Sequence, residues 1–274
     1  MRSIALCIAA VSVFPQAWAH AQDPAEIVRR SVERDWTDFE QQKNYTYIRQ
    51  LDVYQYNGKG ERSLTDSETR EVLILAGRPY QKLIAKDGKP LSGRAAEKEQ
   101  AKLDKEAAKR LTQTTRERTR DQKEREQERK YIREIPEAFR FKLLGEERVS
   151  GQLTWVIEAE PKPGYRPVLS EAKVFTKVRS KIWIEKATYR WVKVDAEVLN
   201  TLSFGLGLVR VAPGGTVRFE QTRVNDEIWL PSHAVIRGDV RLALIRKLRA
   251  EIDINFRDYK KFQSDSRIVE ISGD

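Results

Sequence analysis

The second half of the sequence is dominated by short segments in which apolar and polar residues alternate. Between positions 250 and 256, for example, Ala, Ile, Ile and Phe alternate with Glu, Asp and Asn. Successive side chains of a strand point to opposite faces, so each segment predicts a strand with one apolar face. Turn sequences such as Pro213-Gly214-Gly215 and Asn225-Asp226 separate the segments, which is typical of antiparallel strands joined by hairpins.

These segments, with similar ones near the start of the chain, predict ten or eleven strands. Short connections join most of them, which favours an antiparallel meander, and the helical patterns are confined to the first half. The fold class expected is therefore α+β and mainly β. The predicted strands cover residues 45–56, 71–75, 79–85, 139–149, 153–160, 181–185, 189–199, 207–211, 216–224, 227–237 and 241–256.

Residues 24–42 have a helical pattern. Asp23 suits the N-cap, Pro24 the first helical position and Glu26 the third. Apolar residues then recur at helical spacing as far as Phe39. We expect an amphipathic helix whose apolar side packs on another element.

The first 21 residues have the three parts of a secretory signal peptide. Arg2 precedes an apolar run from Ile4 to Phe14, and small residues around Ala19 and Ala21 have cleavage spacing. The run of about 11 residues is shorter than the roughly 20 that span a bilayer. We predict cleavage near Ala21 and an exported protein that is at most peripheral to a membrane. The alternative is a buried N-terminal helix.

Residues 94–134 differ in composition from the rest of the chain, because 24 of these 41 residues are charged and none is Pro or Gly. Opposite charges four residues apart, such as Glu106 and Arg110, stabilise exposed helices. No apolar residue occurs from Arg116 to Lys130, so this part cannot bury a face. We expect one or two exposed helices, broken near residues 112–115. They are either a solvated insertion without specific function or an arm that docks an envelope protein partner.

Few residues are available for chemistry after signal cleavage. Cys7 and His20 lie in or beside the signal peptide, which leaves His233 and no cysteine. A thiol nucleophile is then excluded, and a zinc site would lack most of its usual ligands. We predict no catalytic residue, no metal site, no cofactor and no enzymatic activity. Lipid-ester hydrolysis that depends on His233 is the alternative.

The chain is basic, with a formal net charge of +10, and a basic chain suits anionic partners. Export argues against nucleic acid, so no nucleic-acid partner is expected. Anionic lipid, lipopolysaccharide or an acidic protein remain as partners, and the alternative is that the charge serves solubility alone.

Three tryptophans are out of phase with the aliphatic residues of their strands: Trp183, Trp191 and Trp229. If the strands are regular, the three rings share one sheet face, and an aromatic and polar face suits a ligand groove. The alternative is that the N-terminal helix covers this face. Residues 202–208 are apolar and glycine-rich, which predicts a mobile apolar flap or a bent strand. Phe204 and Leu206 in this segment are further candidates for a lipid groove.

Four strings carry a family resemblance: KIWIEK at 181–186, YRWVKV at 189–194, EIWLPS at 227–232 and FRDYKKF at 256–262. They resemble bacterial outer-membrane lipoprotein-sorting proteins and, more broadly, the LolA-like superfamily, which includes the periplasmic lipoprotein carrier and the sensor RseB. The strings are strand signatures, and the resemblance covers about residues 139–262 with the leading helix and strands. The charged insertion departs from the plain carrier.

The resemblance implies an open half-barrel, in which an antiparallel sheet curves around a helix and leaves an apolar concavity for acyl chains. It implies a non-enzymatic periplasmic carrier of lipids or lipoproteins, or alternatively an envelope sensor or interaction module that docks through the helical arm. The expected organisation is a signal peptide (1–21), a helix with the first strands (22–92), the charged insertion (93–136) and the remainder of the β domain (137–274).

Overall fold

The computed structural model describes residues 23–42, 44–204, 209–242 and 246–262. The helices are α1 (Pro24–Gln42), α2 (Gly93–Leu111), α3 (Thr115–Arg129), η1 (Lys130–Glu134), α4 (Ile135–Ala138) and η2 (Glu171–Lys177). The strands are β1 (Tyr45–Tyr56), β2 (Arg62–Leu75), β3 (Arg78–Lys86), β4 (Lys89–Pro90), β5 (Phe139–Val149), β6 (Gln152–Pro161), β7 (Val178–Glu185), β8 (Trp191–Val198), β9 (Leu202–Phe204), β10 (Val209–Val211), β11 (Thr216–Val224), β12 (Ile228–Leu242) and β13 (Arg246–Lys261). Among the described residues, no helix is both long and apolar enough to span a membrane.

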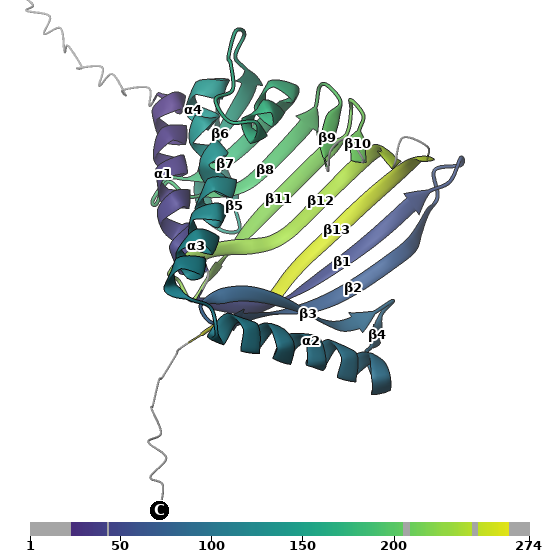
Figure 1. Ribbon diagram of the computed structural model, residues 1–274. Helices are drawn as coiled ribbons and strands as arrows, with labels where there is room; N and C mark the ends of the chain where they lie inside the picture. The colour runs from purple at the N-terminus through teal and green to yellow at the C-terminus, as the bar shows by residue number, and fades with distance from the viewer. Residues whose placement is uncertain (1–22, 43, 205–208, 243–245, 263–274) are drawn as a thin grey trace, which may run out of the picture.

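The 13 strands of the described residues belong to one open antiparallel sheet, in the order β4-β3-β2-β1-β13-β12-β11-β8-β7-β6-β5 (Figure 1). Strand β10 pairs with β12 beside this order, and β9 pairs with β10. The fold class predicted from the sequence is confirmed. The two strands beyond the predicted eleven are β4 and β9, which have two and three residues and are too short to show a period. The first strand pairs with the last, because β1 lies between β2 and β13.

Two-residue turns join several hairpins, and both central residues of each have positive φ. They are Ala76-Gly77, Asp87-Gly88 and Ser150-Gly151, and Asn225-Asp226 has the same positive φ within a three-residue loop between Val224 and Ile228. Such turns match the twist of antiparallel strands, which explains the Gly, Asn and Asp that mark them in the sequence.

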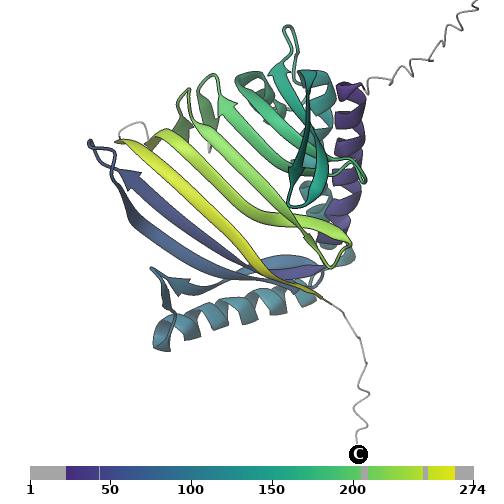
Figure 2. The same cartoon turned by 180° about the vertical axis from the view of Figure 1, so that it is seen from behind.

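Helix α1 begins as predicted, because the Asp23 side chain accepts a hydrogen bond from the backbone N–H of Ala25 at 3.0 Å. Its apolar side packs on the sheet through Ile27 and Val28, which form a buried cluster with Ile157 and Ile184. We call the sheet face that α1 packs on the inner face and the opposite one the outer face. Figure 1 views the sheet from the side of α1, and Figure 2 shows the outer face without helices over it.

The charged segment forms α2 and α3, as the sequence predicts. The break falls at residues 112–114, where Thr114 and Glu117 form a capping box that starts α3. Helix α2 is attached to β3 through Arg110, whose guanidinium donates to the carbonyl of Arg78 at 3.0 Å. Asp121 in α3 forms an ion pair with Arg78. The arm is therefore attached to the sheet edge at its central bend.

Candidate binding site on the inner face of the sheet

The inner face has two regions with different surroundings. On β5 to β8 it lies under α1, and Ile157 and Ile184 there are fully buried. We call this region the covered half. On β11, β12, β13 and β1 most inner-face side chains, including Leu51, Ile252 and Ile254, are half-buried although most are aliphatic, and Ala234 and Ala250 are buried. We call this region the open half.

A cavity of about 360 Å³ lies in the open half, within the roughly 300–1,000 Å³ of ligand sites in general. Strands β1, β11, β12 and β13 contribute its floor, and Leu202 of β9 and Val211 of β10 contribute its wall. Nearly all of the lining is aliphatic. The lining residues are Val53, Gln55, Val198, Leu202, Val211, Thr216, Val217, Ile236, Val240, Leu248, Ala250 and Ile252.

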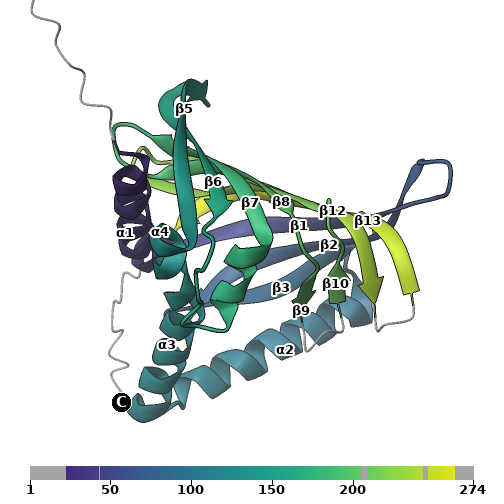
Figure 3. The same ribbon diagram turned by 90° about the horizontal axis from the view of Figure 1, so that it is seen from above.

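The wall exists because β9 and β10 turn out of the sheet toward the side of the helices (Figure 3). Two glycines at the bend make this possible. A Cβ on Gly215 would lie 2.8 Å from Val211 Cγ1, and a Cβ on Gly238 would lie 3.0 Å from the Cα of Gly215. Because both positions lack a side chain, the two backbones approach closely and Val211 reaches over the sheet.

A polar strip borders the open half on β1 and β2. Arg49 stands opposite Arg70 in the pairing of β1 with β2, so both guanidinium groups lie on the inner face. Arg70 forms an ion pair with Glu68 at 2.8 Å, and Lys86 forms one with Asp66 at 2.8 Å. The inner face thus changes from aliphatic to charged within the width of one strand, an arrangement that suits an amphiphile better than a purely apolar ligand.

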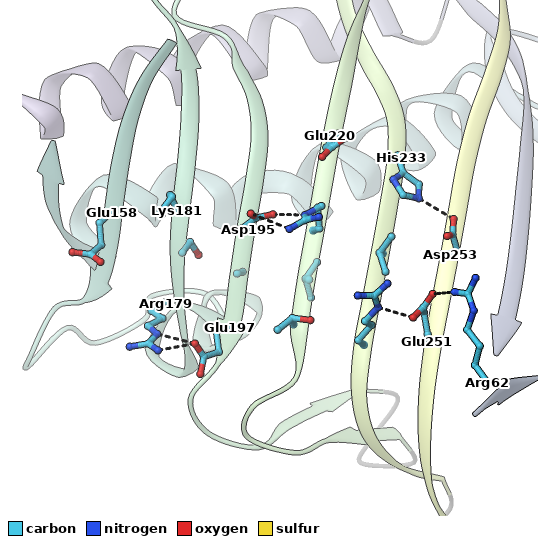
Figure 4. Close-up of a pocket in the computed structure, with 17 residues that line it drawn as sticks. Arg62, Glu158, Arg179, Lys181, Asp195, Glu197, Glu220, His233, Glu251 and Asp253 are labelled. Atoms are coloured by element: carbon cyan, nitrogen blue, oxygen red, sulfur yellow. Dashed lines mark hydrogen bonds and ion pairs between the residues drawn. The ribbon is translucent and has the colours of Figure 1, made fainter. Parts of the chain in front are cut away.

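The outer face carries a larger hollow, of about 630 Å³, lined by rows of charged side chains on β6 to β8 and β11 to β13 (Figure 4). These charges neutralise one another across neighbouring strands. Arg179 forms an ion pair with Glu197 at 2.7 Å, and Arg218 with Asp195 at 2.8 Å. Mutually paired and mostly exposed charges are typical of a solvated sheet face, so the smaller inner cavity is the better binding site.

Glu251 is the most buried charged side chain of the outer face, with 1% of its surface exposed. Burial raises its pKa, but hydrogen bonds from Tyr56 and Arg237 and the charges of Arg237 and Arg62 outweigh burial and hold the pKa below its ordinary value. Tyr56 and Arg62 each donate to Glu251 at 2.6 Å. This cluster links β1, β2, β12 and β13 from behind the open half.

His233 lies in the same outer-face hollow, with its Nε2 2.9 Å from Asp253 Oδ1. Among the described residues, Asp253 is the side chain that hydrogen-bonds to the His233 ring. Within the described residues, no group of three or more His, Cys, Asp or Glu side chains is placed to hold a metal ion.

The predicted single face for the three tryptophans is wrong, because Trp191 lies on the other side of the sheet. A β-bulge interrupts the pairing of β7 with β8 between Trp183 and Ile184, and the extra residue shifts the phase of β8. Trp191 therefore packs with the covered half and with Phe219. Trp183 and Trp229 share a separate cluster with Val156 and Val192.

Each of the three indoles is held by a carboxylate. Trp191 donates to Asp35 of α1 at 3.0 Å, Trp183 donates to Glu147 at 2.8 Å, and Trp229 donates to Glu185 at 3.2 Å. None of the three rings lines the cavity. A buried indole N–H needs an acceptor, and these contacts account for the tryptophans as parts of the packing.

The other two groove candidates, Phe204 and Leu206, belong to the sequence segment 202–208. Phe204 is the last residue of β9, and its side chain is not among those described. Leu206 lies outside the described residues. Strands β9 and β10 border the cavity through Leu202 and Val211, so the apolar glycine-rich sequence does mark the neighbourhood of the site.

The sequence does not identify most of the lining residues. Alternation places Ala250 and Ile252 on one apolar face of their strand, but the same alternation occurs in strands whose apolar face lies under a helix and in strands whose apolar face lines a cavity. Pro213-Gly214-Gly215 and Gly238 were the available signal, since glycines at facing positions of two strands indicate a close approach.

No family model matches the chain, and no curated protein matches it. A putative outer-membrane lipoprotein-sorting protein domain from Vibrio parahaemolyticus matches at 14% identity and TM-score 0.32, over 87% of this chain and 94% of that one. A LolA superfamily protein from Nitrosomonas europaea matches at 10% identity and TM-score 0.31, over 86% and 92%. The MucA/MucB complex of Pseudomonas aeruginosa matches at 10% identity and TM-score 0.25, over 88% and 100%.

Likenesses of this size say nothing about the ligand or the partner of this chain, which must be inferred from its own residues.

Proposed function

We propose that this chain is an exported binding protein that carries an acyl chain of a lipid or lipoprotein in the inner-face cavity. The observation that supports this function is the cavity of about 360 Å³, which is lined almost wholly by aliphatic side chains and open toward a half-buried aliphatic strip. Burying an acyl chain there contributes roughly 0.8 kcal/mol per methylene, so tight binding needs no charged contact. The periplasm is the proposed location, because the first 21 residues have the pattern of a signal peptide.

The wall of the cavity must be displaced for a long ligand to enter or leave. It is held to the sheet by three register pairs between β10 and β12. It also packs on the sheet through Leu202 and Val211, which form a buried cluster with Val198. In this proposal Phe204 and Leu206, from the apolar segment 202–208, contact the ligand.

A matched pair of variants tests the function. Val217→Phe places a ring in the cavity, and Arg218→Phe places the same ring on the outer face of the same strand. Binding of a fluorescent fatty acid should weaken at least tenfold in Val217→Phe and stay within about twofold in Arg218→Phe, because a filled cavity excludes the chain. Native mass spectrometry of the purified wild type should show a bound acyl species. Delipidated protein that ignores the probe would overturn the function.

A second candidate is an envelope sensor or interaction module that docks through α2. The observation in its favour is a stripe of exposed cations at helical spacing that form no ion pair within the described residues: Arg94, Lys98, Lys105 and Lys109. The stripe runs roughly 22 Å along the helix. Two of the four acids of α2, Glu99 and Glu106, pair with Lys102 and Arg110 outside this stripe.

Reversing the stripe tests this candidate without removing the arm. Lys98→Glu, Lys105→Glu and Lys109→Glu combined should abolish salt-sensitive binding to an acidic envelope protein and leave fatty-acid binding unchanged. Arg140→Glu with Lys142→Glu on β5 is the charge control. If the stripe and the control variant behave alike, α2 does not dock a partner by its charge.

A further inference from the structure

One cation of the inner face lacks a counter-charge. The Arg49 side chain makes no hydrogen bond or ion pair within the described residues, and its Nε is buried without a partner. A guanidinium carries five donors in a fixed fork, and burying one of them unpaired costs free energy. An acceptor from outside the protein would remove this cost.

The neighbours of Arg49 increase the need for an anion. Arg70 faces it directly across the strand pair, and like charges in facing positions destabilise a sheet. Glu68 is two residues along β2 and is already bonded to Arg70 and Lys86. The carboxylates of this strip are already bonded to other cations: Glu68 to Arg70 and Lys86, Asp66 to Lys86, and Glu99 of α2, whose charge also acts on Arg70, to Lys102.

Arg49 lies on the same strand and the same sheet face as a residue that lines the cavity. Arg49, Leu51 and Val53 alternate on the inner face of β1, and Val53 lines the cavity. Val53 lies four positions after Arg49 along the strand, which is roughly 13 Å. Leu51 and its partner Ile254 on β13, both half-buried, form the stretch between them. An aliphatic path therefore runs from the cavity to the unpaired guanidinium.

We propose that Arg49 binds the anionic head group of an amphiphile whose acyl chain lies in the cavity, and that the head group is a carboxylate or a phosphate. This inference rests on the proposed function and adds the chemical class of the ligand. The fork of a guanidinium matches both oxyanions in a bidentate manner. The head group lies between Arg49 and Arg70, and the chain follows Leu51 and Ile254 into the cavity.

Calorimetric titration with three probes tests the proposal: dodecanoate, dodecanol and inorganic phosphate. The wild type should bind dodecanoate roughly ten- to a hundredfold more tightly than dodecanol, as expected for a charge-assisted contact. Arg49→Gln should remove this difference by weakening dodecanoate alone. Arg257→Gln is the control, because Arg257 lies on β13 opposite Ile48, one position along β1 from Arg49, and is exposed.

Each outcome decides a separate point. If dodecanoate and dodecanol bind equally well and Arg49→Gln changes neither, the head-group site is wrong and the carrier function stands. If neither amphiphile binds, the carrier function fails. Inorganic phosphate that competes with dodecanoate at equal concentration would show a free-anion site instead. Should Arg49→Gln not fold, as judged by circular dichroism, Arg49→Lys keeps the charge and should show an intermediate preference for dodecanoate.

Discussion

The covered and open halves of the inner face have the same aliphatic alternation but different occupants. In the covered half, Ile157 and Ile184 are 0% and 1% exposed beneath α1. In the open half, Ile252 and Ile254 are only half-buried, and a cavity takes the place of a helix. A strand in which apolar and polar residues alternate thus predicts that its apolar face is covered. Whether a helix of the same chain or a ligand covers that face depends on the rest of the structure.

Different polar contacts hold the two halves. The covered half depends on α1, where Asp38 is 5% exposed and Arg190 donates to it from the end of the covered sheet at 2.9 Å. The open half has no helix of this kind and is tied together on the outer face by Glu251 and its partners. The stability of the covered half should therefore fall when one buried ion pair is removed. The stability of the open half should fall when the pH is lowered.

Asp38→Asn should have the largest effect on stability. It removes the partner of a mostly buried Arg190, and breaking such a pair from one side costs about 3–5 kcal/mol. Asp195→Asn removes a carboxylate from an exposed Arg218 pair and should cost under about 1 kcal/mol. Urea unfolding of both variants provides the comparison. Equal losses of unfolding free energy in the two variants would mean that the Asp38–Arg190 pair does not hold α1 to the sheet.

Truncating equivalent isoleucines should separate the two halves directly. Ile157→Ala leaves a cavity in a sealed core and should lower the free energy of unfolding by about 2–5 kcal/mol. Ile252→Ala enlarges an existing cavity and should cost under about 2 kcal/mol, since less surface is returned to water. The same urea experiment measures both. A cost for Ile252→Ala that matches Ile157→Ala would make the open half an ordinary core.

Acid should act on the open half through Glu251. Its pKa in the folded protein lies below the ordinary value of 4.5, so its contribution to stability is complete above about pH 4.5. The contribution is lost as the pH falls through the folded pKa, because the unfolded chain then binds the proton more readily. Glu251→Gln should unfold at a lower urea concentration at pH 7 and lose part of the acid dependence below pH 4.5. Unchanged acid dependence would assign the effect to other carboxylates.

The sequence predicted the strands better than the faces. Alternation and turn residues located eleven of the thirteen strands, and Asp23-Pro24 located the start of α1. In β8 the sequence did not predict correctly which residues face which side of the sheet, because one β-bulge shifts the alternation. A bulge needs a single additional residue and cannot be recognised from composition. That bulge moved Trp191 from the predicted groove to the packing under α1.

The site was less predictable than the fold, because it depends on contacts between distant segments. The segment 202–208 pointed to the right hairpin, but the bend needs Gly215 and Gly238 to meet across two strands. Nothing in the sequence marks Arg49 as a binding residue. It lacks a partner because the nearby carboxylates form ion pairs with Arg70 and Lys86 instead, and this depends on the folded structure. Period-two reasoning places a side chain on a face and says nothing of its partners.

The smallest expected effect concerns tryptophan fluorescence. Trp183, Trp191 and Trp229 lie outside the cavity, and each indole N–H is bonded to a carboxylate. Dodecanoate in the open half should therefore leave the emission maximum of the wild type nearly unchanged. Leu51→Trp places an indole on the path between the cavity and Arg49, and its emission should shift to shorter wavelength as the ligand excludes water from the ring. If the wild type shifts as strongly as Leu51→Trp, the ligand enters the covered half and displaces α1. The distinction between the two halves would then hold only for the empty protein.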